Sequence, residues 1–484
     1  MTNLTGSNLG DGSAVGRQTE HLDDVSQSRD LPEGWVDTQL GQIVDYGKAA
    51  KKTLEDVEPE TWILELEDIE KDSSKLLSKV NASERPFKST KNAFKKGDVL
   101  YGKLRPYLNK VIIAESDGVC TTEIIPIDSE PFCLNCYLFY WLKSSKFLHY
   151  VDEVSYGVNM PRLGTKDANA APFRLAPLAE QKVIADKLDE LLAQVESTKA
   201  RLDAIPAILK SFRQSLLAAA VSGKLTEEWR GENGVDLSSW KTVKVGDFVQ
   251  AIEAGKSLKC IETPPSQNEF GIIKISAVTW GIYDESESKT LPSKDLFIEN
   301  RRVKVGDLLI SRANTMELLG NPVIVHNVTK NLMLSDKVLR LVMDDVDKPW
   351  VSIFLRSKSG RKEIEGRSTG NQMSMRNIGQ KALLDIGLPK ATQSEQAEIV
   401  RRAEALFAFA DKVEAQVNAA QKRVNNLTQS ILAKAFRGEL TADWRAANPE
   451  LISGENSAEA LLKRIKAERE ALSVKKKPAK KAKA

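Results

Sequence analysis

The chain has 484 residues, of which 41% are hydrophobic, and this length favours two or more domains, each with a core of its own. Lysine and arginine number 70 against 67 acidic residues, so any basic surface for a nucleic acid must be local. The sequence has no run of about 18 apolar residues, no secretion leader pattern and no secreted-type framework among its four cysteines. We therefore expect a cytoplasmic protein without a membrane span.

The first domain is expected over residues 31–179, after a segment rich in Ser, Gly and Asp, residues 1–30, that we expect to be disordered. Segments of β-branched residues between turn residues predict strands, and residues 133–151 predict an amphipathic helix. The predicted strands are residues 99–104, 110–115 and 121–127. The predicted fold class is therefore α/β (α+β), with a small and mostly antiparallel sheet.

Basic residues concentrate at 85–110, a pattern that suits phosphate contact, with an ordinary solvated surface as the alternative. Reading of DNA bases needs forked donors and acceptors, such as those of Arg, Asn and Gln. The candidate DNA-binding residues of this domain are Lys103, Arg105, Asn159 and Arg162. For each of them, a structural or phosphate-contacting role is the alternative.

A long helix is predicted within residues 180–230, because apolar residues recur at alternating spacings of four and three, as in a coiled-coil seam. Gly223 stands where this helix would end in a left-handed residue, and Gly438 stands at the aligned position after the second long helix described below. Pro206 predicts a bend or break, because proline removes a backbone hydrogen bond. The predicted seam positions are Ile184, Leu188, Leu191, Val195, Leu202, Leu209, Phe212 and Leu216.

The second domain is expected over residues 231–394 and loosely repeats the first. Its predicted strands are residues 271–278, 307–312, 321–326 and 338–343, and its predicted amphipathic helix is 348–364. A second basic group lies at residues 356–376. The candidate DNA-binding residues here are Arg312, Asn314, Asn371, Gln372 and Arg376.

A second long helix, within residues 395–445, aligns with residues 180–230 without a gap, and residues 446–484 predict a C-terminal helix with a lysine-rich tail. The predicted seam positions are Ile399, Leu406, Val413, Val417, Val424, Leu427 and Ile431. We expect the two seams to bury against each other. The alternatives are packing of each seam on its own domain, or pairing between chains. A helix of roughly 38 residues is about 57 Å long, and such a rod could hold two DNA-reading domains at a fixed separation.

Tests for catalytic motifs give no candidate. Residues 254–257 (AGKS) resemble the end of a phosphate loop, but Gln250 stands where that loop needs glycine. Residues 321–324 (NPVI) lack the second proline and the aromatic residue of the motif that holds adenine in amino-methyltransferases. Three histidines in the whole chain argue against a histidine-based acid–base pair. The pair Cys133 and Cys136 would need two more zinc ligands, so we favour a buried helix face and expect no metal site.

The repeated segments resemble the two conserved regions of the specificity (S) subunit of type I restriction–modification systems. The first reads PLAEQKVIADKLDELLAQVESTKARL and the second SEQAEIVRRAEALFAFADKVEAQV, and the opening LPEGW of residues 31–35 is also typical of that family. The resemblance extends over about residues 31–470.

This resemblance implies a non-catalytic subunit with two target-recognition domains, each reading one half of a split sequence in double-stranded DNA. The conserved helices would lie antiparallel and set the unread spacer, and the N- and C-terminal segments would meet. Two modification subunits would bring S-adenosylmethionine and methylate adenine N6, and restriction subunits would use ATP and Mg for cleavage. This chain would hold no cofactor. The competing hypotheses are a self-sufficient methyltransferase or nuclease, and a structural coiled-coil tether.

Overall fold

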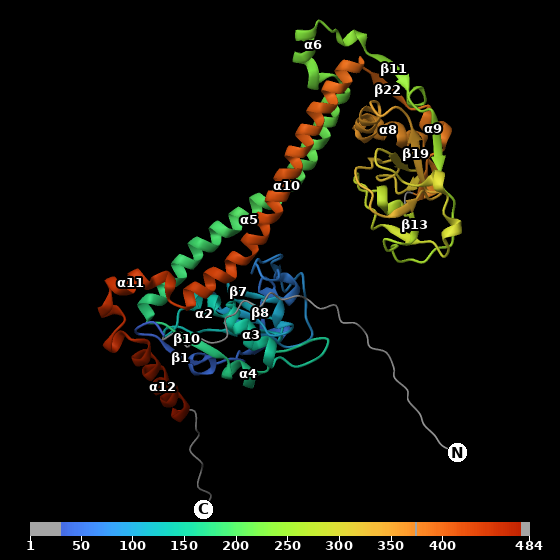
Figure 1. The fold of residues 1–484 in the computed structure, drawn as a ribbon. Coiled ribbons are helices and arrows are strands. Elements are labelled where there is room, and N and C mark those ends of the chain that lie inside the picture. Colours follow the sequence, from blue (N-terminus) through green and yellow to red (C-terminus); the bar gives the residue numbers. More distant parts are fainter. Residues whose placement is uncertain (1–30, 373–374, 476–484) are drawn as a thin grey trace, which may run out of the picture. The chain divides into compact units, whose positions relative to one another are not determined.

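The computed structural model describes the backbone of residues 31–372 and 375–475 (Figure 1). The predictions for residues 1–30 and for the lysine-rich end, 476–484, lie outside the described residues. The chain divides into two compact units. Unit 1 combines the chain up to Glu196 with the chain from Asn426 onward, and unit 2 is Ser197–Asn425. Both boundaries fall inside the long helices, so each unit contains one globular domain and a part of each helix.

The globular domain of unit 1 is a mixed α/β fold built from small sheets. Strand β3 (Trp62–Leu64) runs parallel to β8 (Gly118–Cys120), and the other strand pairs of the domain are antiparallel. The five-stranded sheet has the order β2 (Lys51–Lys52), β5 (Lys91–Phe94), β8, β3, β4 (Val80–Asn81). The three-stranded sheet has the order β7 (Val111–Ile113), β6 (Val99–Gly102), β9 (Ile124–Ile127), and β1 (Val36–Gln39) pairs with β10 (Pro172–Leu175).

The helices of this domain are α1 (Leu40–Ile43), α2 (Asn135–Leu142), α3 (Ser145–Val154) and α4 (Thr165–Ala170). They bury aromatic side chains against β6 and β10, and Trp141 of α2 is fully buried. The indole Nε1 of Trp141 donates to the carbonyl oxygen of Pro172 at 3.0 Å, which satisfies its buried polar group.

The globular domain of unit 2 repeats this plan. Strand β13 (Phe270–Ile273) runs parallel to β18 (Asn331–Met333), and Trp350 Nε1 donates to the carbonyl oxygen of Pro389 at 3.0 Å, as Trp141 does to Pro172. The four-stranded sheet has the order β12 (Ala251–Ala254), β19 (Val338–Val342), β15 (Leu308–Ser311), β17 (Pro322–Ile324). One three-stranded sheet has the order β14 (Ser288–Thr290), β13, β18, and the other has the order β16 (Ala313–Asn314), β21 (Met375–Asn377), β20 (Thr369–Gln372). Strands β11 (Lys241–Lys244) and β22 (Gly387–Lys390) form a pair. The helices are α7 (Lys348–Arg356), α8 (Lys358–Arg367) and α9 (Gln380–Leu384).

Two helix predictions and one strand prediction are wrong in extent. The single helices expected at 133–151 and 348–364 are pairs, α2 with α3 and α7 with α8, each broken before a serine N-cap. The Ser144 hydroxyl accepts from the N–H of Phe147 and the Ser357 hydroxyl from that of Gly360, so each serine starts a new helix. The strand expected at 271–278 ends at Ile273 and continues as a 3₁₀ turn.

The two long helices are α5 (Leu178–Val221) and α10 (Gln393–Phe436). Helix α5 continues through Pro206, so of the bend or break expected there the break is absent, and the bend stays a prediction. Each helix ends before a left-handed glycine, Gly223 with a φ of 80° and Gly438 with a φ of 74°, as the sequence predicts. Short helices follow, α6 (Glu227–Asn233) after α5, and α11 (Ala442–Ala447) with α12 (Ala458–Lys475) after α10.

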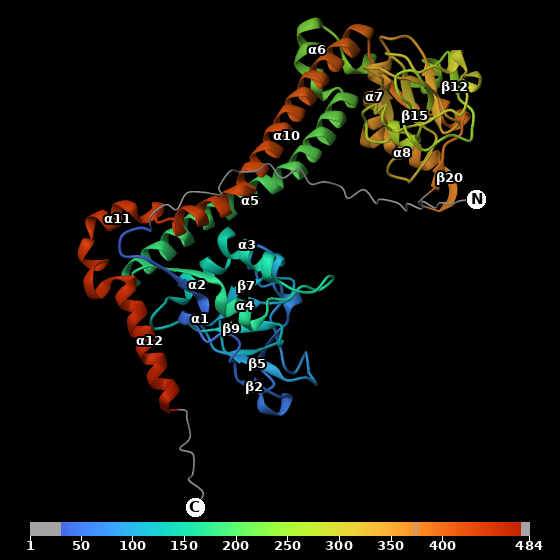
Figure 2. The ribbon, with the colours of Figure 1, turned by 60° about the horizontal axis from the view of Figure 1, so that its bottom comes forward.

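Within each unit the segments of α5 and α10 run side by side in opposite directions (Figures 1 and 2). In unit 2, the Arg213 guanidinium of α5 lies 2.7 Å from carboxylate oxygens of both Asp411 and Glu414 of α10. The amide of Gln421 donates to Asp203 at 2.8 Å in the same unit. The two helices therefore pack together, as expected for an antiparallel coiled coil.

The predicted seam positions differ in burial. The half-buried positions are Leu191, Leu202, Phe212, Leu406, Val413 and Ile431. The buried positions are Ile184, Leu188, Val195, Leu209, Leu216, Ile399, Val417 and Val424. Leu427 is 42% exposed and does not fit a buried seam. Toward the end of α10 the buried residues are Leu432, Ala435 and Phe436, which pack into the core of the globular domain of unit 1, where Phe436 contacts Tyr137 and Trp141 of α2.

Candidate functional site

Two segments of unit 1 bring three of the four candidate residues together. The N–H of Leu163 donates to the carbonyl oxygen of Lys103 at 3.0 Å, and the N–H of Arg105 donates to that of Pro161 at 2.7 Å. Leu104 forms a bridge with Arg162. The segment that follows β6 therefore lies directly beside the loop between α3 and α4, and the backbones of Lys103, Arg105 and Arg162 lie close together.

The side chains of this region combine charge with exposed apolar groups. Arg105 is exposed and has a left-handed φ of 49°, whereas Arg162 donates to the carboxylate of Glu123 at 3.2 Å. Asn159 is also exposed, at the tip of the loop between α3 and α4. Next to them stand exposed apolar side chains, namely Tyr107, Tyr156, Val158 and Met160. Exposed apolar groups beside basic ones are typical of surfaces that contact a partner.

Unit 2 has the same arrangement at the matching place in its sequence. The N–H of Ile378 donates to the carbonyl oxygen of Arg312 at 3.0 Å, as Leu163 does to Lys103 in unit 1. Asn314 of β16 lies opposite Arg376 of β21. Strand β21 lies between β16 and β20, and Asn371 and Gln372 lie on β20. The side chains of Asn371 and Gln372 lie outside the described residues. The sheet β16–β21–β20 thus gathers the candidate positions of the second domain.

Two of these side chains hold local structure together. The guanidinium of Arg376 donates to the carbonyl oxygen of Ser368 at 2.8 Å and also to that of Gly370, and so fastens the β20–β21 hairpin. Asn314 donates from Nδ2 to the hydroxyl of Thr279 at 3.2 Å and accepts from the N–H of Thr315 at 2.9 Å. Their donors are therefore occupied within the domain itself.

The two basic groups, residues 85–110 and 356–376, have fewer cations available for phosphate contact than the sequence suggests. In the group at 85–110, Arg85 pairs with Asp68 at 2.5 Å, and the largely buried Lys91 pairs with Glu65. In the group at 356–376, Arg361 donates to the carbonyl oxygens of Leu319 and Met316, and Arg367 pairs with Glu363 at 2.5 Å. Burial lowers the pKa of Arg356 and of Arg361 below the ordinary range. Several of these cations therefore serve the fold of their own domain.

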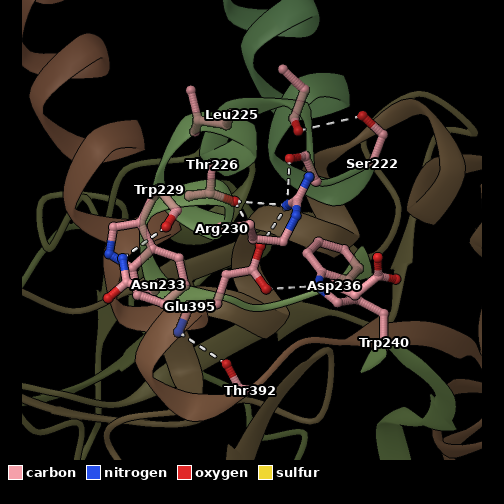
Figure 3. A network of polar contacts seen from close by, with 12 residues as sticks. Ser222, Leu225, Thr226, Trp229, Arg230, Asn233, Asp236, Trp240, Thr392 and Glu395 are labelled. Atoms are coloured by element: carbon pink, nitrogen blue, oxygen red, sulfur yellow. Dashed lines mark hydrogen bonds and ion pairs between the residues drawn. The ribbon is translucent and has the colours of Figure 1, made fainter. Parts of the chain in front are cut away.

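A buried polar cluster joins the start of α10 to the end of α5 in unit 2 (Figure 3). Its centre is Glu395, whose side chain is fully buried. One carboxylate oxygen accepts from the guanidinium of Arg230 at 2.6 Å and from the hydroxyl of Thr226 at 2.8 Å. The other oxygen accepts from the indole Nε1 of Trp240 at 2.8 Å. Arg230 also donates to the carbonyl oxygen of the left-handed Gly223 at 2.7 Å, so the end of α5 is fixed at the start of α10.

Unit 1 contains the same cluster with the roles of the helices exchanged. Glu180, at the start of α5, accepts from Arg445 and Thr441 at 2.6 Å each and from Trp35 Nε1 at 2.7 Å. We call these two groups the Glu180 clamp and the Glu395 clamp. Each fully buried carboxylate has an ion-pair partner and several hydrogen bonds, which is the condition for keeping a charge inside a protein.

The Glu180 clamp also brings the N-terminal part of the described chain to its C-terminal part. Trp35 comes from the opening LPEGW segment, while Thr441 and Arg445 follow α10. The N–H of Ala458 at the start of α12 donates to the carbonyl oxygen of Gly34 at 2.8 Å, and Arg469 of α12 bonds to Asp45 at 2.5 Å. The two ends therefore meet, as the resemblance implies.

Sequence reasoning aligned the clamp residues but gave them no role. The gap-free alignment of residues 180–230 with 395–445 pairs Glu180 with Glu395 and Arg230 with Arg445. The signal that could have found the clamps was present: a glutamate opens each helix, and a threonine with an arginine four residues later follows each helix. The alignment does not show that each glutamate binds the threonine and arginine that follow the other long helix.

The described residues contain no group of three or more His, Cys, Asp or Glu side chains placed to hold a metal ion. Cys133 is buried and Cys136 half-buried, and all four cysteines are free. Burial raises the pKa of the Cys133 and Cys120 thiols, which favours the neutral form that does not bind zinc. Among the described helices, none is both long enough and apolar enough to span a bilayer.

Comparison with known proteins gives the family. The model of the type I restriction modification DNA specificity domain matches residues 32–207. The type I restriction enzyme EcoKI specificity subunit of Escherichia coli (strain K12) is 42% identical over 351 residues, which cover 71% of this chain and 73% of that protein. The chain belongs to the family of type I restriction enzyme specificity subunits.

Further relatives agree with this membership. The StySPI specificity subunit of Salmonella potsdam is 39% identical over 346 residues, 70% of this chain and 73% of that protein. The crystal structure of an HsdS subunit from Thermoanaerobacter tengcongensis covers 85% of this chain and 98% of its own, with a TM-score of 0.55 and 21% identity, and so supports the fold. As a type I specificity subunit, the chain recognises DNA and is a non-catalytic part of a restriction–modification system, which confirms the resemblance found in the sequence.

Proposed function

We propose that this specificity subunit reads a split DNA target, with one half read by each globular domain. The first target-recognition domain is residues 31–179 and the second is residues 231–394. The helices within residues 180–230 and 395–445 fix the length of the unread spacer, and residues 446–484 complete the junction with the N-terminal segment. The observation that carries this proposal is the repeated loop arrangement. In each domain a corresponding backbone hydrogen bond, from Leu163 to Lys103 or from Ile378 to Arg312, joins two of the segments that carry candidate residues.

Within each domain the candidate residues have different proposed roles in contacting DNA. Arg105 and Asn159 are exposed and free to approach bases or phosphates in a groove. Lys103 and Arg162 lie beside Arg105 and fit phosphate contacts. In the second domain Arg312 is the counterpart of Lys103, and Asn371 and Gln372 have the amide groups that suit adenine. Asn314 and Arg376 position the strands, because their donors are already used inside the domain.

The partners follow from the family. We propose that two modification subunits, carrying S-adenosylmethionine, dock on the helix pair and methylate adenine N6, and that restriction subunits supply ATP- and Mg-dependent cleavage. The chain itself holds no cofactor. Exposed apolar side chains on both helices support a docked partner, because Ile208 of α5 is 62% exposed and Phe409 of α10 is 61% exposed. Four free cysteines suit the reducing cytoplasm in which we place the complex.

Selection of bound duplexes from a randomised library tests this proposal with the full chain. We expect two short blocks of selected sequence separated by a fixed number of unselected base pairs. Arg105→Gln should relax the block read by the first domain and leave the other block intact. Arg312→Gln should do the reverse, so the two variants control each other. A single uninterrupted block would contradict the split target, and enrichment of no sequence at all would favour the structural tether.

A further inference from the structure

A cavity of about 540 Å³ opens inside the second domain. Four parts of the chain line it. They are Lys256, Ser257, Leu258 and Glu262 in the connection that follows β12, residues 272–276 at the end of β13 and in the turn after it, Lys289 of β14, and residues 335–337 before β19. All of them belong to unit 2. The volume lies in the range of small-molecule sites, roughly 300 to 1,000 Å³, and exceeds what a single phosphate fills.

Lysine is the dominant charged residue of this cavity. Lys256, Lys274, Lys289 and Lys337 line it, against the carboxylates of Glu262 and Asp336. Lys289 lies 2.7 Å from Glu262, and Lys337 lies 3.7 Å from Asp336. Lys274 lies 3.8 Å from Glu287, outside the lining. Ion pairs this exposed or this long contribute little, so these lysines can turn toward a bound anion at small cost.

A close backbone contact fixes one lysine at the edge of the cavity. Gly255 lies against the carbonyl of Leu334, and a Cβ at this position would stand 1.6 Å from that oxygen. The N–H of Gly255 donates to the carbonyl oxygen of Ser335 at 3.1 Å, and Lys256 forms a parallel bridge with Ser335. The AGKS segment at residues 254–257, which fails as a phosphate loop, therefore places a lysine beside residues 335–337.

Apolar side chains provide the rest of the surface. Leu258, Ile272 and Ile275 line the cavity beside the lysines. Apolar surface next to cations matches the chemistry of a nucleotide, in which a sugar joins an anionic phosphate to a flat base with an apolar face.

The cavity adjoins the strand that carries the candidate DNA-binding residues. The N–H of Arg312 donates to the carbonyl oxygen of Lys337 at 3.0 Å. The turn after β13 leads to Thr279, whose hydroxyl accepts from Asn314 at 3.2 Å. A DNA strand contacted by Arg312 would thus pass close to the lysines of the cavity.

We propose that this cavity binds one nucleotide unit by its phosphate, with Lys256, Lys274 and Lys337 as donors and the apolar wall against the sugar and base. The location next to Arg312 favours a nucleotide of the bound DNA strand, and this assignment of the source rests on the proposed function. A free nucleotide has the same chemistry and is the second source that the experiment separates.

The experiment compares two double variants of the full chain. Lys256→Gln with Lys337→Gln removes two cations from the cavity. Lys259→Gln with Lys304→Gln removes two exposed lysines of the same domain that do not line it. One arm measures affinity for a duplex of arbitrary sequence as a function of salt concentration. The other measures binding of AMP and of inorganic phosphate by calorimetry. Thermal unfolding confirms that both variants fold.

We expect the cavity variant to weaken duplex binding and to reduce the slope of log affinity against log salt by about 0.9, the value for one phosphate. The control variant should keep the slope of the unmodified chain. Binding of AMP that is lost in the cavity variant alone also supports the site, with a free nucleotide as its ligand. Equal behaviour of the two variants in both arms would overturn the proposal. Because the duplex has an arbitrary sequence, a slope change remains readable even if the split target proves wrong.

Discussion

At the scale of single residues, the two clamp glutamates are the side chains on which both helix junctions depend. Each is fully buried, with an arginine and a threonine on one oxygen and a tryptophan on the other. Taking away one charge of a buried ion pair leaves the other uncompensated, which costs about 3 to 5 kcal/mol. The clamps therefore stabilise the junctions only as complete sets.

We predict that Glu395→Gln lowers the free energy of unfolding by about 3 kcal/mol, because Arg230 would stay buried without a carboxylate. Urea unfolding of the full chain measures this change. Glu404→Gln, on the exposed side of the same helix, is the matched control and should change stability by less than about 0.5 kcal/mol. Equal stability of the two variants would show that the clamp does not hold the junction.

Lys143 gives a prediction on pH. It is 7% exposed, its ammonium lies 2.5 Å from the hydroxyl of Ser74, and burial lowers its pKa to about 8. Between that value and the ordinary pKa of lysine the unfolded chain binds the extra proton, so this group makes stability rise with pH. Below about pH 8 the folded chain must bury the charge.

Replacing Lys143 by methionine should remove this pH dependence. We expect Lys143→Met to be more stable than the unmodified chain at pH 7, by on the order of 2 kcal/mol, with the difference shrinking toward pH 10. Denaturant unfolding at both pH values measures it. A difference that stays constant over this range would contradict a charge buried at Lys143.

At this scale the sequence indicates which side chains can form hydrogen bonds or ion pairs, but it does not indicate their bonding partners. The glutamates, the threonines and the arginines of the clamps are visible in the repeat, but their partners lie more than a hundred residues away. The same holds for Arg376, whose forked donors suit a base and are used instead on Ser368 and Gly370. Residue type indicates which bonds are possible, and only the fold decides which are made.

At the scale of elements, the helix pair agrees with the sequence better than the globular domains do. Helical periodicity is a local property, and it predicted α5, α10 and the glycines that follow them. The breaks at Ser144 and Ser357 were missed, because apolar side chains continue across both serines while the backbone restarts. Leu427 was misplaced, because the end of α10 buries Leu432, Ala435 and Phe436 in the globular domain of unit 1 and leaves Leu427 exposed.

Lengthening the helix pair tests its role as the spacer. Asp203 and Gln421 face each other in unit 2, so one heptad inserted after each keeps the seam in register. We expect the unread spacer to grow by up to about three base pairs, since seven residues add about 10 Å of helix and base pairs are about 3.4 Å apart. A heptad inserted after Gln421 alone is the control and should abolish binding to the split target. A selected target with an unchanged spacer would contradict the role of the helices.

At the scale of the whole molecule, the chain contains two copies of the same arrangement, a globular domain followed by a long helix. In each unit a clamp joins the start of one long helix to the residues that follow the other. The repeat in the sequence predicted this repeated arrangement, and the resemblance to the family implied the junction of the terminal segments, in which the structure places Trp35 and α12. Sequence could not predict which side chains are free to contact DNA, because bonds inside each domain already engage some candidates, such as Arg162 with Glu123 and Arg376 with Ser368.

Exchange of one domain tests whether the two halves are independent. We predict that replacing residues 240–390 by the corresponding part of another specificity subunit changes one half of the DNA target and leaves the other half and the spacer intact. The hybrid keeps both clamps, because it has a tryptophan at position 240, the first exchanged residue, and because Glu395 lies outside the exchanged range. Library selection with the hybrid measures both halves at once, and changes in both would contradict independent reading.

The most direct measurement is the methylated motif of cells that carry this subunit with its modification partners, read by single-molecule sequencing of native DNA. The account predicts N6-methyladenine in a motif of two short specific blocks around a spacer of fixed length, with one methylated adenine in each block. Methylation confined to one continuous block, or a spacer that varies from site to site, would contradict it.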